Sequence, residues 1–237
     1  MGEEADADCN IHGFLRAPDG TITIFDGPGA IETEAFSVSD EGLLTGSYFD
    51  SSKMRHGFLR AADGTITSFD PKDSIDTIPV SINKVGVIAG TYEDNNILVH
   101  GFVRRKGGTI TSFDVPGAAE TEAVGIDDSG EIAGWYIDSQ SARHGFVRTA
   151  KGKIRTFDPA GSNSTEPVAI NKDGTVTGSY SDSSFIHGFV RGADGAIKTF
   201  DPKGSVATSP RAINGKGAIA GYFLGNDEHY HGFLRTP

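Results

Sequence analysis

The stretch "TIPVSINKVGVIAGTYEDNNILVHGFVRRKGGTITSFDVPGAAE", residues 77–120, contains one full copy of a unit that repeats along the chain. Its triplet His-Gly-Phe recurs six times, with histidines at positions 12, 56, 100, 144, 187 and 231. Successive histidines are 44 residues apart in four intervals and 43 in one. A fixed period in this range is typical of propellers, solenoids and other repeat arrays.

Four short apolar segments lie inside the unit, at residues 79–83, 87–92, 100–104 and 109–114, and we name them A, B, C and D. Each is rich in Val, Ile, Thr, Phe or Tyr and is bounded by turn residues, as β-strands are. None has the i, i+3, i+4, i+7 apolar spacing of an amphipathic helix. Turns such as "NKVG" between A and B, and the Gly-ended turns between C and D, are typical of short hairpins. The sequence therefore predicts an all-β protein.

Two hairpins joined by a B–C loop, with a linker of constant length to the next A, describe the four-stranded antiparallel blade of a β-propeller. Strands A, B and D occur five times and strand C occurs six times, so we expect a five-bladed propeller. The chain starts at C–D and ends at A–B–C, and its terminal strands are expected to close one blade. Either A, B and C of the C-terminus join strand D of residues 21–26, or A and B join the N-terminal C–D hairpin. The sequence favours the first arrangement.

The repeat covers residues 11–237, which we expect to form a single propeller domain, and residues 1–10 are expected to form a flexible tail. The tail is acidic and has no apolar segment, unlike a secretory signal peptide. The sequence contains no run of about 18 apolar residues, so no membrane span is predicted.

The net charge of −11 and the lack of a basic stripe argue against nucleic acid as a partner. The single cysteine, Cys9, rules out an intrachain disulfide and a thiolate zinc site.

The chain resembles the bacterial HAF-repeat family of extracellular repeat proteins. The resemblance rests on the His-Gly-Phe triplets, on segments such as "INKVGVIAGTY" at 82–92, and on the "GTITxFD" segments, and it covers residues 11–235. The central residue of the triplet is Gly in all six copies, where the family has Ala. The resemblance implies a propeller-like repeat fold and an extracellular or periplasmic location, and it implies no defined activity.

Symmetry about the C–D turn places each histidine of the triplet opposite the Asp that ends strand D. These pairs are His56–Asp70, His100–Asp114, His144–Asp158 and His187–Asp201, while His12 and His231 compete for Asp26. One such pair could be a general base. Catalysis needs only one such pair, whereas the chain has one in every repeat. We therefore interpret the pairs as structural latches that hold strands C and D of each blade together. The Arg that closes each C segment is expected to be an exposed charge at a strand end.

The starts of A and C and the ends of B and D share one side of the predicted blade. We name this side the loop face, because it carries the B–C and D–A loops; the mouth of the predicted central channel lies there. Carboxylates gather on it beside a repeated Thr, at Glu32, Glu34, Asp76, Glu120, Glu122 and Glu166. They suit a solvated acidic rim, a Ca²⁺ site at Glu32, Glu34, Glu120 and Glu122, or glycoside chemistry by Glu34, Glu122 and Glu166. Apart from Ca²⁺, no cofactor is expected.

Residues that break the repeat point to the same face. An aromatic surface beside polar groups suits a carbohydrate or another polar small molecule. The residues that supply it are Trp135, Tyr222, Arg211, Phe36, His229 and Tyr230.

We therefore predict a non-catalytic protein that recognises a carbohydrate or polar small molecule at the channel-mouth side, as a monomer and without membrane insertion. A glycan-active hydrolase or lyase and a protein-interaction scaffold are the alternatives.

Overall fold

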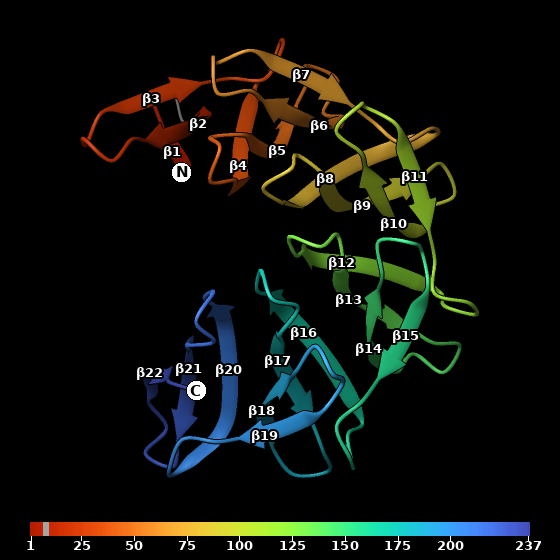
Figure 1. Ribbon diagram of the computed structural model, residues 1–237, viewed down its shortest axis with the longest axis vertical. Coiled ribbons are helices and arrows are strands. Elements are labelled where there is room, and N and C mark those ends of the chain that lie inside the picture. Colours follow the sequence, from red (N-terminus) through yellow and green to blue (C-terminus); the bar gives the residue numbers. More distant parts are fainter. Residues whose placement is uncertain (7–9) are drawn as a thin grey trace. The chain divides into compact units, whose positions relative to one another are not determined.

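The computed structural model describes residues 1–6 and 10–237, and this part of the chain contains 22 strands and no helix (Figure 1). The prediction of an all-β protein is confirmed. None of these residues belongs to a helix of the length and hydrophobicity that a bilayer crossing requires. Cys9 lies outside the described residues. Contacts divide the chain into two compact units, residues 1–113 and 114–237, and each unit is described by itself.

The first unit contains two complete four-stranded antiparallel sheets. The first is formed by β4 (Glu32–Val38), β5 (Leu44–Phe49), β6 (Arg55–Arg60) and β7 (Ile66–Phe69). The second is formed by β8 (Ser74–Ile82), β9 (Ile88–Asp94), β10 (Val99–Arg104) and β11 (Ile110–Phe113). A single parallel bridge between Arg55 and Asp76 joins the two sheets.

The second unit contains two complete four-stranded sheets and a three-stranded sheet, which a single parallel bridge between Ile186 and Ala207 joins to the second complete sheet. The complete sheets are β12 (Glu120–Ile126), β13 (Ile132–Ile137), β14 (Arg143–Arg148) and β15 (Ile154–Phe157), then β16 (Ser164–Ile170), β17 (Val176–Ser181), β18 (Ile186–Arg191) and β19 (Ile197–Phe200). The three-stranded sheet is β20 (Ser205–Ile213), β21 (Ile219–Gly225) and β22 (Tyr230–Arg235). Each complete sheet has the strand order A, B, C, D that the repeat predicts.

The A–B turns show why these residues form hairpins. The Asn83 side-chain oxygen accepts the backbone N–H groups of Val85 and Val87, at 3.2 and 3.0 Å. Gly86 then takes a φ of 82°, a conformation in which glycine alone meets no steric penalty. Because each copy has an Asn, Asp or Ser and a Gly at these positions, the chain reverses in the same way at every A–B turn.

Neighbouring sheets pack through the phenylalanines of the repeat. The Phe of the triplet is fully buried in four copies, at Phe58, Phe102, Phe146 and Phe189. The Phe that ends strand D meets the triplet Phe of the next repeat edge to face, with ring centroids 5.9 Å apart for Phe25–Phe58 and Phe157–Phe189. This pairing repeats the same apolar contact between successive sheets of each unit.

The prediction of exposed arginines after each triplet is wrong for three of the six copies, while Arg16 is exposed. Arg60, Arg104 and Arg191 are 8%, 7% and 5% exposed. Their guanidinium groups lie 4.8–5.1 Å from the ring centroid of the strand-D Phe in the preceding repeat, which is Phe69 for Arg104. A planar, weakly hydrated guanidinium stacks on an aromatic face at low desolvation cost, so these arginines cover the inter-sheet core.

The N-terminal sheet departs from the prediction. It consists of β1 (Gly2–Ala5), β2 (Ile11–Arg16) and β3 (Ile22–Phe25), in that order. Residues 2–5, expected to belong to a flexible tail, thus form a strand that pairs with β2. β3 pairs with β2, so the favoured arrangement, in which residues 21–26 join the C-terminal strands, is not the one observed. The single domain over residues 11–237 stays a prediction.

Candidate ligand-binding face

A cluster around Arg143 occupies the loop face of the second unit. Arg143 is the first residue of β14, and its guanidinium lies 3.9 Å from the ring centroid of Trp135 on β13. Its Nη1 is 3.1 Å from Glu166 Oε2, on the first strand of the next sheet. Glu122 is the β12 partner of Trp135. One arginine thereby joins two sheets and covers the single tryptophan of the chain.

Burial raises the pKa of Glu122, the charge of Arg143 opposes that shift, and Glu120 and Glu166 add to it. Glu122 therefore holds a proton more readily than an exposed glutamate does. Glu166 faces the same cation and acts as its ion-pair partner.

The first unit repeats this arrangement around Arg55. Arg55 Nη2 donates to Glu34 Oε2 at 2.6 Å, and its guanidinium lies 4.9 Å from the ring centroid of Phe49. Asp76 of the next sheet has an oxygen 4.0 Å from Arg55 Nη1. Burial raises the pKa of Asp76, Arg55 opposes the shift and Glu34 adds to it. Ser47 Oγ donates a long bond of 3.4 Å to Glu34.

The sequence interpretation missed Arg55 and Arg143. The signal was present, because an Arg precedes the triplet in two of the six copies only, giving "RHGF" at residues 55–58 and 143–146. The other copies have Ile11, Val99, Ile186 and Tyr230 at this position. The acidic rim predicted for this face is thus partly neutralised by cations in both units.

A crevice opens on the loop face where the repeat has Ile186 in place of this arginine. It has a volume of about 430 Å³ and lies between the β16–β19 sheet and the β20–β22 sheet. Phe185 and Ile186 are 50% and 42% exposed. The lining residues are Ser181, Asp182, Ser183, Ser184, Phe185, Ile186, Val206, Ala207 and Leu224.

Asp182 is held rigidly at this crevice. Its carboxylate accepts the N–H groups of Ser184 and Phe185 at 2.7 and 2.9 Å, and His187 Nε2 lies 3.2 Å from it. The backbone hydrogen bonds from Phe185 and Ser184 lower the pKa of Asp182, and the hydrogen bond with His187 also lowers it. The crevice therefore combines an exposed aromatic ring, hydroxyl groups and a fixed carboxylate.

Three of the predicted ligand residues gather on the last sheet. Arg211 Nη2 donates to the Tyr222 hydroxyl at 2.6 Å, and the rings of Tyr222 and Tyr230 lie edge to face with centroids 5.5 Å apart. Arg211 lowers the pKa of the Tyr222 hydroxyl through this bond and through its charge. Tyr230 is 72% exposed, so it offers an open ring face.

Of the other predicted ligand residues, Trp135 and Phe36 do not belong to this surface. Trp135 is 8% exposed and lies under Arg143, so its ring is not a free stacking platform. His229 is exposed, and its Nδ1 lies 2.6 Å from the backbone oxygen of Asp227. Phe36 is half-buried on β4, in the first unit.

The predicted Ca²⁺ ligands fall in both units, with Glu32 and Glu34 on β4 and Glu120 and Glu122 on β12. Within residues 1–6 and 10–237, no group of three or more His, Cys, Asp or Glu side chains has the arrangement of a metal site. The sequence-based proposal of a Ca²⁺ site rests on composition alone.

The histidines lie where the hairpin register places them. His56, His144 and His187 Nδ1 are 2.7, 2.8 and 2.6 Å from Asp70, Asp158 and Asp201. Each Nε2 also lies near an Asp of the preceding B–C loop, as in the 3.3 Å contact between His144 and Asp138. The ring of each histidine packs on an aromatic residue of strand B, with ring centroids 5.0 to 5.2 Å apart in the pairs Tyr48–His56, Tyr136–His144 and Tyr180–His187. The repeated environment fits a structural role.

The terminal copies of the triplet have different partners. His12 Nδ1 lies 2.8 Å from Asp26, whereas His231 Nε2 lies 3.0 Å from Asp227 in the preceding loop. Asp26 is therefore the partner of His12 within the first unit, and the pairing of His231 with Asp26, across the two units, stays a prediction. His100 and Asp114 belong to different units, and their pairing stays a prediction.

Comparison with known proteins identifies the fold and no family. Neither a family model nor a curated protein matches the chain, so the resemblance to the HAF-repeat family stays a prediction. Among solved structures, the chain is similar to a streptogramin B lyase, with 17% identity, 100% of this chain and 83% of that chain covered, and a TM-score of 0.57.

Two further structures show the same likeness. A putative TolB from Agrobacterium tumefaciens has 12% identity, 99% and 89% coverage of the two chains and a TM-score of 0.59. The Aleuria aurantia lectin, described as a six-bladed β-propeller, has 10% identity, 98% and 85% coverage and a TM-score of 0.52. At these identities the likeness carries the fold alone, and the chain is an all-β repeat protein whose structural neighbours are β-propellers.

Proposed function

We propose that the protein binds a carbohydrate or another polar small molecule at the loop face, without catalysis. The crevice beside Phe185 carries this proposal, because an exposed aromatic ring lies next to serine hydroxyls and a fixed carboxylate. Ligand sites are concave and combine apolar surface with a few oriented polar groups. The exposed Tyr230 and its neighbours Tyr222 and Arg211 supply a second polar and aromatic surface on the adjoining sheet.

The proposal is tested by titrating a panel of neutral and acidic oligosaccharides in a calorimeter. Phe185→Ala should weaken binding by about tenfold, which corresponds to about 1.4 kcal/mol. Ile97→Ala is the matched control, since Ile97 is an exposed apolar residue in the corresponding B–C loop two repeats earlier. Binding that is unchanged by Phe185→Ala, or no binding to any member of the panel, contradicts the proposal.

One observation favours the hydrolase or lyase alternative. Burial raises the pKa of Glu122, the cross-strand partner of Trp135, and a carboxyl group with a raised pKa is suited to general-acid catalysis. A fold that occurs in both a lyase and a lectin excludes neither function. If the protein releases product from a glycan, Glu122→Gln should abolish most of that release. Release that survives this substitution removes Glu122 from the catalytic assignment.

The five-bladed arrangement, the extracellular or periplasmic location and the monomeric state belong to the same proposal. Five copies of strands A, B and D support the blade number. The location rests on the resemblance to extracellular repeat proteins. The scaffold alternative predicts neither binding nor turnover of the panel.

A further inference from the structure

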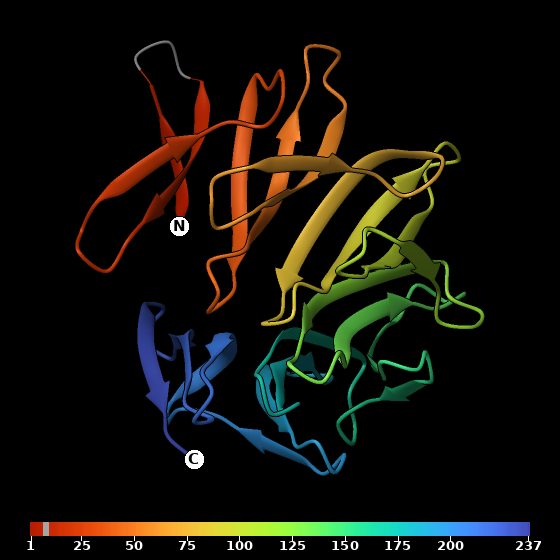
Figure 2. The same cartoon turned by 45° about the horizontal axis from the view of Figure 1, so that its top comes forward.

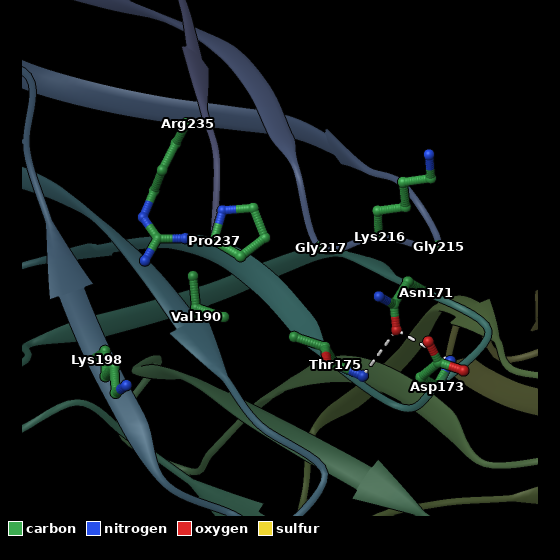
Figure 3. A pocket seen from close by; sticks show the side chains of 10 residues that line it. All are labelled: Asn171, Asp173, Thr175, Val190, Lys198, Gly215, Lys216, Gly217, Arg235 and Pro237. Carbon is green, nitrogen blue, oxygen red and sulfur yellow. Dashed lines mark hydrogen bonds between the residues drawn. The ribbon is translucent and has the colours of Figure 1, made fainter.

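A second crevice lies in the second unit, at the opposite end of the strands from the loop face. Its volume is about 360 Å³, and it lies beside the turns that join β16 to β17 and β20 to β21 (Figure 3). Three cations line it: Lys198 on β19, Lys216 in the β20–β21 turn, and Arg235 at the end of β22. Figure 3 shows the charged ends of Arg235 and Lys198 on the same side of the crevice. We name it the basic crevice.

The cations of the basic crevice have no carboxylate partner in the described part of the chain. No carboxylate oxygen lies within 4.0 Å of Lys198, Lys216 or Arg235 there, and Asp173 has Lys172 as its neighbour at 3.5 Å. Arg235 stacks over Phe200, with its guanidinium 5.1 Å from the ring centroid. Lys198 is exposed, so it can move toward a ligand.

The preceding repeat shows what normally accompanies such a pair of cations. There the positions of Lys198 and Arg235 hold Arg155 and Arg191. Burial raises the pKa of Glu131, and the charge of Asp127 raises it further. The charges of Arg191 and Arg155 lower it, so both arginines attract the Glu131 carboxylate. In that repeat the chain itself supplies the negative charge.

In the basic crevice both acids are replaced by neutral residues. Asn171 takes the position of Asp127, and the two cap their turns in the same way: Asp127 accepts the N–H groups of residues 129 and 131, and Asn171 those of residues 173 and 175. Thr175 takes the position of Glu131. These two replacements remove two negative charges, and Asp173, which also lines the crevice, adds one where the preceding repeat has Ser129. Both cations are kept, and Lys216 adds a third.

We propose that the basic crevice binds a small oxyanion or an anionic substituent of a larger ligand: sulfate, phosphate or the carboxylate of an acidic sugar. An external anion would take the electrostatic role that Glu131 has one repeat earlier. The net charge of −11 does not prevent this, because charges beyond about 8 Å are largely screened at physiological ionic strength, so the local cations dominate. The site is independent of the loop face and goes beyond the proposed function.

The test is calorimetric titration of the full chain with sodium sulfate, inorganic phosphate and glucuronate, with glucose as the neutral control. The repeat itself supplies a mild variant: Lys198→Thr with Lys216→Val installs the residues found at Thr67 and Val85. We expect at least one anion to bind, more weakly as salt is raised, and this variant to weaken binding by about tenfold or more. Lys72→Thr with Lys203→Thr removes the same charge outside the crevice and should leave binding unchanged.

Thr175→Glu gives a second arm, because it restores the carboxylate of the preceding repeat without removing a cation. It should abolish anion binding while the circular dichroism spectrum stays that of the parent. Preference for glucuronate would assign the site to acidic sugars, and preference for phosphate or sulfate to those esters or free ions. No binding of any anion at about 10 mM in low salt, or equal binding by the parent and both crevice variants, overturns the proposal.

Discussion

At the scale of single residues, the histidine of the triplet and the arginine that follows it have different roles. The histidine bonds an Asp only 14 positions away across a hairpin, as His56 does with Asp70. The arginine reaches back to the preceding repeat, as Arg104 does over Phe69. The first contact follows from hairpin register, which a sequence displays. The second depends on how two sheets pack, and for that reason the arginines were expected to be exposed.

The histidine latches predict a pH dependence of stability. The hydrogen bond with Asp201 raises the pKa of His187, and burial acts against that rise. The stabilisation is therefore fully present below the unfolded-state pKa of about 6.5 and is lost as the pH rises through the higher folded-state pKa. The free energy of unfolding in urea should fall as the pH rises above about 6.5. His187→Gln and Asp201→Asn should each reduce that fall, and an unchanged pH profile in both variants would refute the latch.

At the scale of strands, the glycine of the triplet is required by the strand beside it. In the hairpin β18–β19, a Cβ at Gly188 would lie 2.7 Å from the ring of Phe200. On β22, a Cβ at Gly232 would have no neighbour within 4 Å. Gly188 and Gly232 have the same place in the triplet. The difference in the room around them therefore comes from strand D, which covers Gly188 and has no counterpart beside Gly232 in the described chain.

This difference gives a matched pair of variants. Gly188→Ala should lower the free energy of unfolding by about 1–3 kcal/mol, because the Phe200 ring must move out of its packed position. Gly232→Ala should change it by less than about 0.5 kcal/mol, as exposed substitutions do. Urea titration of the two variants beside the parent checks both values. Equal losses would show that the glycine is needed for its backbone conformation and not for the room it leaves.

At the scale of the whole molecule, the units consist of complete sheets and of shorter sheets at the two ends of the chain (Figures 1 and 2). In a complete sheet the C strand has a neighbour on each side, as β18 has β17 and β19. In the described chain β22 has β21 as its hydrogen-bonded neighbour. Stability in repeat proteins is close to a sum of such nearest-neighbour terms, so it should differ between equivalent strands.

Hydrogen exchange measures that difference directly. Residues 230–235 should take up deuterium faster than residues 186–191, although both segments contain the triplet and both form strand C of their repeat. The reason is that the outer backbone N–H groups of β22 face solvent, whereas those of β18 bond to β19. Equal uptake in the two peptides would mean that another strand protects β22 in solution.

Much of the site could not be read from the sequence, for a reason visible in Trp135. Its aromatic character and its departure from the repeat favoured a ligand platform, but Arg143 covers its ring. The crevice beside Phe185 was missed for the converse reason. It lies where Ile186 stands in place of the arginine found at Arg143 one repeat earlier, and a crevice between two sheets depends on how they pack.

The sequence by itself determined the strands, the turns and the cross-strand partners, because each depends on residues within one hairpin and the repeat states the pattern five times. The register of Thr77 with Tyr92 and the contact of His187 with Asp201 follow from that local rule. Only the tertiary structure decided that the arginines stack on the preceding repeat, that β1 pairs with β2, and that two crevices lie between the last two sheets, at opposite ends of their strands. These features depend on side-chain volume and charge across neighbouring sheets, where the repeat is least regular.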